Sequence, residues 1–162
     1  QDIGILSISG TASAIGQQYL KTQILSKPQI MAWPNEFPYE LSEVERESGR
    51  IYLERLRLVN DQPVFYDINN LPNINLPRFT SRSFENKSLF ELLRSNYQIE
   101  ITGGEQKLKA IKATKQISEL LKIKTGDPVL YLERKLNTNR EGFHIYSTIY
   151  FNSEKHSIFG IF

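Results

Sequence analysis

The sequence has no cysteine, few histidines and no long hydrophobic run, and each of these absences excludes a class of protein. Without cysteine, the chain has no disulfide framework, no thiolate metal site and no cysteine nucleophile. Its two histidines lack the His-Glu-x-x-His spacing, which argues against a histidine-based metal site. No apolar stretch approaches the ~18 residues of a membrane span. We therefore expect no metal, no cofactor and no membrane partner.

Signatures of common enzymes are also missing, and charge of one sign is not in large excess. Neither a Gly-Lys-Ser/Thr phosphate loop nor a Gly-x-Ser-x-Gly nucleophile elbow occurs, so we expect no enzyme activity. The net charge is only +2, whereas a dedicated nucleic-acid or membrane-surface binder carries a concentrated basic excess. The charge balance therefore argues against a protein of either class.

The length and composition are those of one soluble globular domain. The chain has 162 residues, of which 40% are hydrophobic and 23% charged, and one domain usually holds about 100–200 residues. No basic segment followed by an apolar run marks a signal peptide, so we expect a cytoplasmic protein. Because residue 1 is Gln rather than Met, we interpret residues 1–162 as a single domain of a longer protein.

Strand patterns dominate the chain. Residues 51–58 and 63–68 flank a polar turn and predict a hairpin, and residues 129–136 and 143–151 predict a second hairpin with a longer loop. Strand signals also cover residues 17–32, where Pro28 favours an edge or a bulge, and residues 106–110. The apolar tail, residues 158–162, is typical of a last strand or a subunit contact.

Short helices precede these strands, and the elements repeat. Helices are predicted over residues 41–47, 88–97 and 114–122. The helix-turn-strand segment that ends in Leu53-Glu54-Arg55 is similar in sequence to the later segment that ends in Leu132-Glu133-Arg134. This pattern predicts an α+β fold: one largely antiparallel sheet, built from two similar halves and flanked by short helices.

Two arginines two residues apart are the most informative feature of the sequence. Strand side chains alternate between faces, so Arg55 and Arg57 project together with Ile51 and Leu53. Two neighbouring guanidinium groups repel each other unless an anion lies between them, and their geometry fits a phosphate or a carboxylate. The alternative is a pair of surface arginines bridged by a nearby acid such as Asp67.

A run of hydroxyl side chains near the N-terminus is a second candidate anion site. Ser7 and Ser9 flank an isoleucine ahead of Gly10, and exposed backbone amides with hydroxyl donors bind anions at such positions. The alternative is simple helix capping in a solvated linker.

The stretch 52–64, Tyr-Leu-Glu-Arg-Leu-Arg-Leu-Val-Asn-Asp-Gln-Pro-Val, resembles the UTRA domain. This domain is the ligand-sensing module of GntR-family bacterial transcription regulators of the HutC subfamily. The resemblance continues in order from about residue 5 to residue 159, through Leu71-Pro72, residues 88–93, 119–121 and 126–130, Glu133-Arg134 and Tyr146-Ser147.

The resemblance implies a chorismate lyase-like fold, a homodimer, and an N-terminal winged helix-turn-helix domain, absent from this chain, that binds operator DNA. It also implies a small anionic effector, such as a sugar phosphate or an organic acid, that changes the DNA affinity of the full-length protein, expected to be a repressor. The effector site implied by the matching positions consists of Ser7, Ser9, Arg55, Arg57, Asp67, Ser88 and Phe151.

Some positions depart from the pattern of sugar-binding relatives. Ile145 stands where those relatives carry Glu, and Phe151 stands where they carry a pocket tyrosine. The arginine pair that would bind the anionic group, which we call the clamp, is therefore kept, whereas some of the polar residues that bind the sugar in those relatives are missing. Two alternatives to an effector sensor remain open: a chorismate lyase-like enzyme, and an interaction module whose pocket has collapsed.

Overall fold

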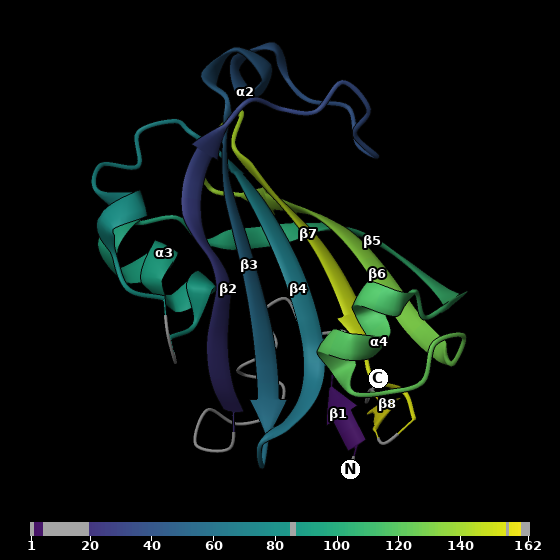
Figure 1. The fold of residues 1–162 in the computed structure, drawn as a ribbon. Coiled ribbons are helices and arrows are strands. Elements are labelled where there is room, and N and C mark those ends of the chain that lie inside the picture. The colour runs from purple at the N-terminus through teal and green to yellow at the C-terminus, as the bar shows by residue number, and fades with distance from the viewer. Residues whose placement is uncertain (1, 5–19, 85–86, 155, 160–162) are drawn as a thin grey trace.

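The described part of the chain is built around one six-stranded antiparallel sheet (Figure 1). The computed structural model describes residues 2–4, 20–84, 87–154 and 156–159. The strands of the sheet follow the order β2-β3-β4-β7-β6-β5. Their bounds are β2 (Leu20–Met31), β3 (Arg50–Val59), β4 (Gln62–Pro72), β5 (Ile101–Lys112), β6 (Pro128–Thr138) and β7 (His144–Phe151).

Both predicted hairpins are confirmed. The turn between β3 and β4 consists of Asn60 and Asp61, whose positive φ angles of 49° and 61° match the right-handed twist of a tight hairpin. A longer loop, residues 139–143, joins β6 to β7, and Gly142 in it has a φ of 70°. The edge position of β2 is confirmed as well, and its pairing with β3 shifts register on both sides of Ser26, up to Gln29.

The two similar halves predicted from the internal repeat meet at the centre of the sheet. Helix α2 (Glu43–Ser48) leads into the β3–β4 hairpin, and α4 (Lys115–Leu121) leads into the β6–β7 hairpin. Strands β4 and β7 then pair antiparallel, which joins the halves. The α+β, largely antiparallel class is therefore confirmed.

In the described part of the chain, each α-helix begins after a hydroxyl side chain that caps it. Ser42 and Glu45 form a capping box at α2, so this helix starts two residues later than predicted. Ser88 caps α3 (Leu89–Tyr97) and Thr114 caps α4, because each hydroxyl accepts a hydrogen bond from the third amide along. Outside the sheet lie a short 3-10 helix, η2 (Phe79–Ser81), and a parallel pair of strands, β1 (Asp2–Gly4) and β8 (Ser157–Phe159).

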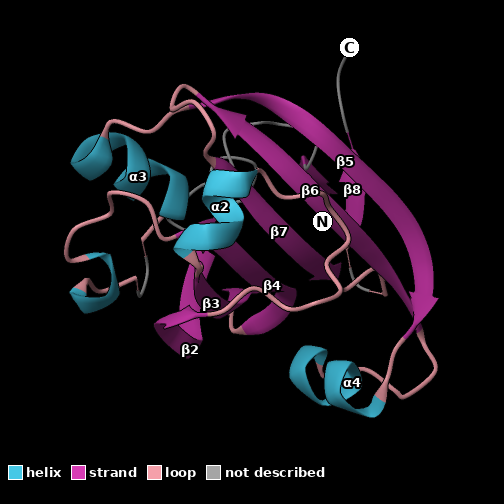
Figure 2. Cartoon of the chain, turned by 90° about the horizontal axis from the view of Figure 1, so that it is seen from above, coloured by secondary structure: helices cyan, strands magenta, loops and turns pink. Residues whose placement is uncertain are grey.

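The two faces of the sheet are covered by different elements. We call the face that carries Leu53 the inner face: η2, α3 and the segments around them pack on it in the larger core cluster, which includes Phe79 and Leu93. The opposite, outer face carries Leu56, which packs with Leu121 of α4. Figure 2 shows α3 and α4 on opposite sides of the sheet. None of the helices in the described part of the chain has the length and hydrophobicity that a membrane crossing requires.

Tyrosines and glutamates cluster on the outer face. The hydroxyl of Tyr66 donates to Glu54, and that of Tyr131 donates to Glu133 at 2.6 Å. The ring of Tyr150 lies between them, 5.5 Å from Tyr66 and 5.1 Å from Tyr131 by ring centroids. Burial, and then the neighbouring carboxylates, raise the pKa values of all three tyrosines.

This cluster predicts a loss of stability in alkali. On the same face, burial and Glu54 raise the pKa of Tyr52 from 10.0 to about 12. A folded-state pKa above the unfolded value favours the folded protein below pH 10, and this contribution is lost as the pH rises toward 12. We expect the urea midpoint to fall between about pH 9 and about pH 11, with the tyrosines of this cluster ionising only as the protein unfolds. Ionisation of all eight tyrosines in the folded protein with the midpoint of free tyrosine would contradict this prediction.

Candidate functional site

The two arginines that the sequence singled out lie side by side on the inner face of β3. Arg55 and Arg57 are 4% and 3% exposed, so the predicted strand alternation places them inward, together with Leu53. The alternative of a surface pair is wrong with respect to exposure. It is correct in one detail, because Asp67 of β4 pairs with Arg55.

The ion pair between Arg55 and Asp67 is buried and uses one carboxylate oxygen. Asp67 Oδ2 accepts from Arg55 Nη2 at 2.6 Å and from Arg55 Nε at 3.2 Å, and also from Asn69 Nδ2 at 3.0 Å. Within the described part of the chain, Arg55 Nη1 and Asp67 Oδ1 are buried and have no hydrogen-bond partner. Such atoms are costly to leave unsatisfied, so the pair retains one donor and one acceptor for a ligand.

Arg57 adds a second buried cation to this pair. Burial, and then repulsion by Arg55, lower the pKa of Arg57 to about 9, although Asp67 partly offsets both. The guanidinium is still protonated at neutral pH, but its charged form is disfavoured here. A bound anion would relieve this strain, which gives the site a preference for negatively charged ligands.

Further polar residues on the same face were not named as site residues from the sequence. Arg134 of β6 is 4% exposed, and Asn69 and Ser147 are buried beside it on β4 and β7. The ladder places Ser147 opposite both Arg134 and Asn69, and Asn69 opposite Leu53, so all of them lie on the inner face. The internal repeat could have identified Arg134, because Glu133-Arg134 in the second half corresponds to Glu54-Arg55 in the first.

The remaining predicted site residues have different positions. Phe151 is 1% exposed and stands opposite Phe65, which in turn stands opposite Arg57, so it lies on the inner face two strands from Arg57. Ser88 is half-buried, and its hydroxyl caps α3 by accepting from Glu91 N at 3.3 Å. Ser7 and Ser9 lie outside the described residues.

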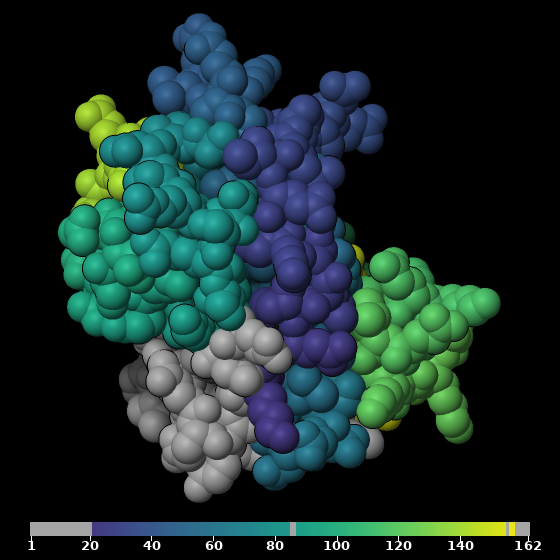
Figure 3. Space-filling view, turned by 60° about the vertical axis from the view of Figure 1, so that its left-hand side comes forward, coloured from purple at the N-terminus to yellow at the C-terminus, as the bar shows by residue number. Residues whose placement is uncertain are grey.

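A groove lies between β2 and the segment that carries η2. It has a volume of about 720 Å³ and is lined by β2 residues, including Ile24, and by residues 80–84. Figure 3 shows this side of the molecule, with β2 next to the segment that contains η2 and α3. Because Ile24 pairs with Arg55 across the β2–β3 ladder, the groove ends one strand away from the arginine pair.

The described residues offer no metal centre. Within the described ranges, no group of three His, Asp or Glu side chains could hold a metal ion. The inner face instead combines guanidinium groups, one carboxylate, an amide and a hydroxyl. This set can bind an acidic ligand and orient its polar groups.

Comparison with known proteins identifies a family and a shared fold. A model of the UTRA domain matches residues 17–157. The effector domain of PhnF from Mycobacterium smegmatis superposes with a TM-score of 0.81 at 13% identity, over 100% of this chain and 99% of that one. YydK from Bacillus subtilis superposes with a TM-score of 0.77 at 17% identity, over 99% of this chain and 67% of that one. A GntR-family transcriptional regulator from Enterococcus faecalis superposes with a TM-score of 0.64 at 18% identity, over 87% of this chain and 97% of that one. No curated protein matches the sequence.

Proposed function

Because this chain belongs to the UTRA domain family, we propose that it senses an anionic small metabolite on the inner face of its sheet. The observation that carries the proposal is the buried pair Arg55 and Arg57, which is accompanied by the carboxylate of Asp67. A carboxylate or a phosphate would lie against both guanidinium groups, with Arg55 Nη1 as one of its donors. Asp67 Oδ1 would accept a hydroxyl or an amine of the same ligand.

Other predicted residues complete this proposed site. Phe151 would form an apolar wall of the site, because it lies on the same face as Arg57, two strands away, with Phe65 between them. Ser88, together with Ser7 and Ser9, would supply hydroxyl groups to the ligand. Sugar phosphates and organic acids both satisfy this set, and neither needs a cofactor or a metal ion.

The proposed output is regulation of transcription rather than chemistry. Domains of this fold occur in longer chains, since this chain spans 70% of the PhnF regulator from Mycobacterium smegmatis. We propose that a winged helix-turn-helix domain precedes residue 1 in the full protein, that the protein is a cytoplasmic homodimer, and that the effector changes its affinity for operator DNA. A coupling free energy of about 1–3 kcal/mol is sufficient, provided that the effector binds one arrangement of the dimer better than the other.

Replacing Arg57 by methionine tests the clamp. We expect sugar phosphates to raise the melting temperature of the wild-type chain, because a ligand of the native state stabilises it by mass action. Loss of charge-assisted hydrogen bonds at Arg57 should weaken binding about 10- to 150-fold while the chain remains folded. Calorimetric titration with glycerol phosphate measures the change directly.

The matched control for this variant is Arg46→Met, because Arg46 is an exposed arginine on α2 and should not affect binding. Undiminished affinity in Arg57→Met would refute the proposed clamp. Equal losses in both variants would show that the ligand responds only to the net charge of the chain.

A further inference from the structure

A continuous polar band crosses the inner face from β3 to β6. It consists of Arg55, Asp67, Asn69, Ser147 and Arg134, all of them buried. Asn69 Nδ2 donates to Asp67 Oδ2 at 3.0 Å, and Ser147 Oγ donates to Asn69 Oδ1 at 2.7 Å. Ser147 then stands opposite Arg134 in the β6–β7 ladder. The rest of this face is largely apolar, so the band is a distinct polar path between two arginines.

The band carries a cation at each end and a single carboxylate. Arg55 and Arg57 lie at the β3 end, Arg134 lies at the β6 end, and Asp67 is the acidic member of the band, next to Arg55. Burial lowers the pKa of Arg134, as it does for Arg57, so both ends favour a negatively charged neighbour. Apolar side chains of similar size would fill the same space at lower cost, so packing alone does not require a buried arginine at this position.

We propose that Arg134 is a second anion-binding residue, and that the effector carries two acidic groups, one at each end. One group would bind Arg55 and Arg57, and the other would bind Arg134. This inference rests on the proposed function, since it extends the same site. It names the ligand class as an elongated dianion, such as a dicarboxylate or a phosphorylated carboxylic acid.

The topology sets the length of such a ligand. Strands β4 and β7 separate β3 from β6, and neighbouring strands lie about 4.8 Å apart, so the two backbones are about 14 Å from each other. The arginine side chains extend from these backbones over the same face. A single phosphate is too small to meet both ends, whereas a chain with an acidic group at each terminus can lie along Asn69 and Ser147, which offer neutral hydrogen-bonding atoms between the charges.

A matched ligand series tests the inference. Phosphonoalkanoates of increasing chain length carry a phosphonate and a carboxylate, and alkyl phosphonates of equal length lack the carboxylate. We expect the wild-type chain to bind a phosphonoalkanoate of optimal length about 10- to 100-fold more tightly than its matched alkyl phosphonate, because the second charge forms charge-assisted hydrogen bonds. Arg134→Met should abolish this preference and bind the alkyl phosphonate as the wild type does.

Lys135→Met is the control variant, since Lys135 is the next residue of β6 and projects to the opposite face. It should keep the wild-type preference. If Arg134→Met does not fold, the wild type is compared with Arg134→Lys instead. The preference for the phosphonoalkanoate should be smaller in Arg134→Lys, because the lysine can reach the second acid but cannot form a bidentate pair.

The outcomes separate this inference from the proposed function. Equal binding of both ligands by the wild type, or a preference that survives in Arg134→Met, would overturn the role of Arg134 and leave the clamp of Arg55 and Arg57 intact. Failure of the wild type to bind any member of either series would overturn both.

Discussion

Replacing Arg55 by alanine should lower the free energy of unfolding by about 3–5 kcal/mol, because it leaves the buried carboxylate of Asp67 without its cation. Two hydrogen bonds, at 2.6 and 3.2 Å, join these side chains, and both residues are buried. A domain has only about 5–15 kcal/mol of stability in total. The expected result is a large fall in the urea midpoint, measured by circular dichroism.

Arg57→Met provides the contrast to Arg55→Ala, because Arg57 is repelled by Arg55. Its removal should leave stability within about 1 kcal/mol of the wild type, and it can even stabilise the chain. A double variant, Arg55→Met with Asp67→Leu, should recover most of the stability lost in Arg55→Ala, since the buried carboxylate is removed together with its cation. Equal destabilisation by Arg55→Ala and Arg57→Met would show that the ion pair is not what makes Arg55 important for folding. Ligand-binding studies of this site are therefore cleaner in variants of Arg57 than in variants of Arg55.

The parts of the fold that could be predicted are those that depend on local pattern. Alternation along residues 51–58 predicted which side chains of β3 share a face, and the buried positions of Arg55 and Arg57 confirm it. Turn residues predicted both hairpins, and hydroxyl caps at Ser88 and Thr114 predicted the starts of α3 and α4 to within a residue. Each of these features is determined by residues within a few positions of one another.

Features that depend on distant pairing could not be predicted in the same way. The central pairing of β4 with β7 brings Asn69 opposite Ser147 and so completes the polar band, but the two residues are 78 positions apart. The cap at Ser42 was not predicted, and neither was the contact of Glu45 with β7, because that carboxylate accepts from residues about 100 positions later. Local patterns show which face of the sheet a side chain lies on, and only the assembled sheet shows which residues it contacts.

Replacing Glu45 by alanine should destabilise the chain by about 2–4 kcal/mol, because several buried donors lose one acceptor. The Glu45 side chain is fully buried. Its carboxylate accepts from the amides of Ser42 and His144 at 3.1 Å each, and from the hydroxyl of Tyr146 at 3.1 Å. Burial and the charge of Glu45 raise the pKa of Tyr146, so the tyrosine remains a donor throughout the physiological range.

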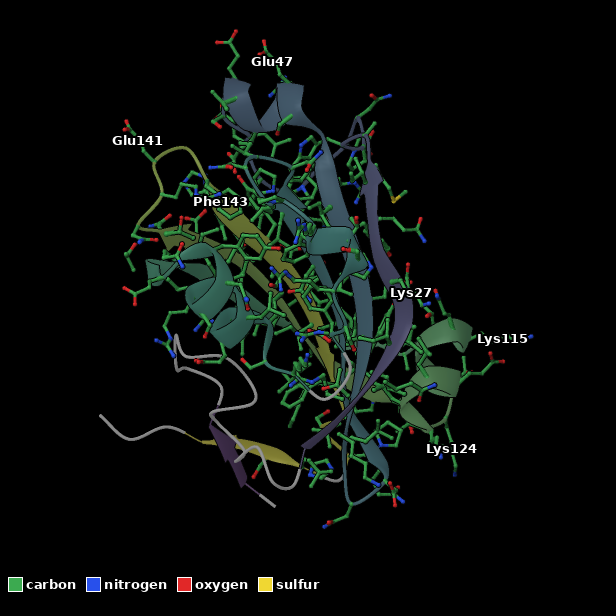
Figure 4. The ribbon with its side chains drawn as sticks, turned by 90° about the vertical axis from the view of Figure 1, so that its left-hand side faces the viewer. Lys27, Glu47, Lys115, Lys124, Glu141 and Phe143 are labelled. Atoms are coloured by element: carbon green, nitrogen blue, oxygen red, sulfur yellow. The ribbon has the colours of Figure 1, made fainter. Side chains whose placement is uncertain are left out.

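The single tryptophan reports on this cluster directly. Trp33 Nε1 donates to the backbone carbonyl of Glu45 at 2.7 Å, and the ring of Trp33 lies 5.7 Å from that of Tyr146. In Glu45→Ala, the Trp33 emission should shift to the red before the main unfolding transition, because α2 loses its tie to β7 while the rest of the sheet remains paired. Glu47→Ala is the matched control. Glu47 is exposed on the same helix, at the top of the molecule in Figure 4, and its removal should change stability by no more than about 0.5 kcal/mol. If both variants behaved alike, the stability of this end of the sheet would derive from its aromatic packing and not from the buried carboxylate.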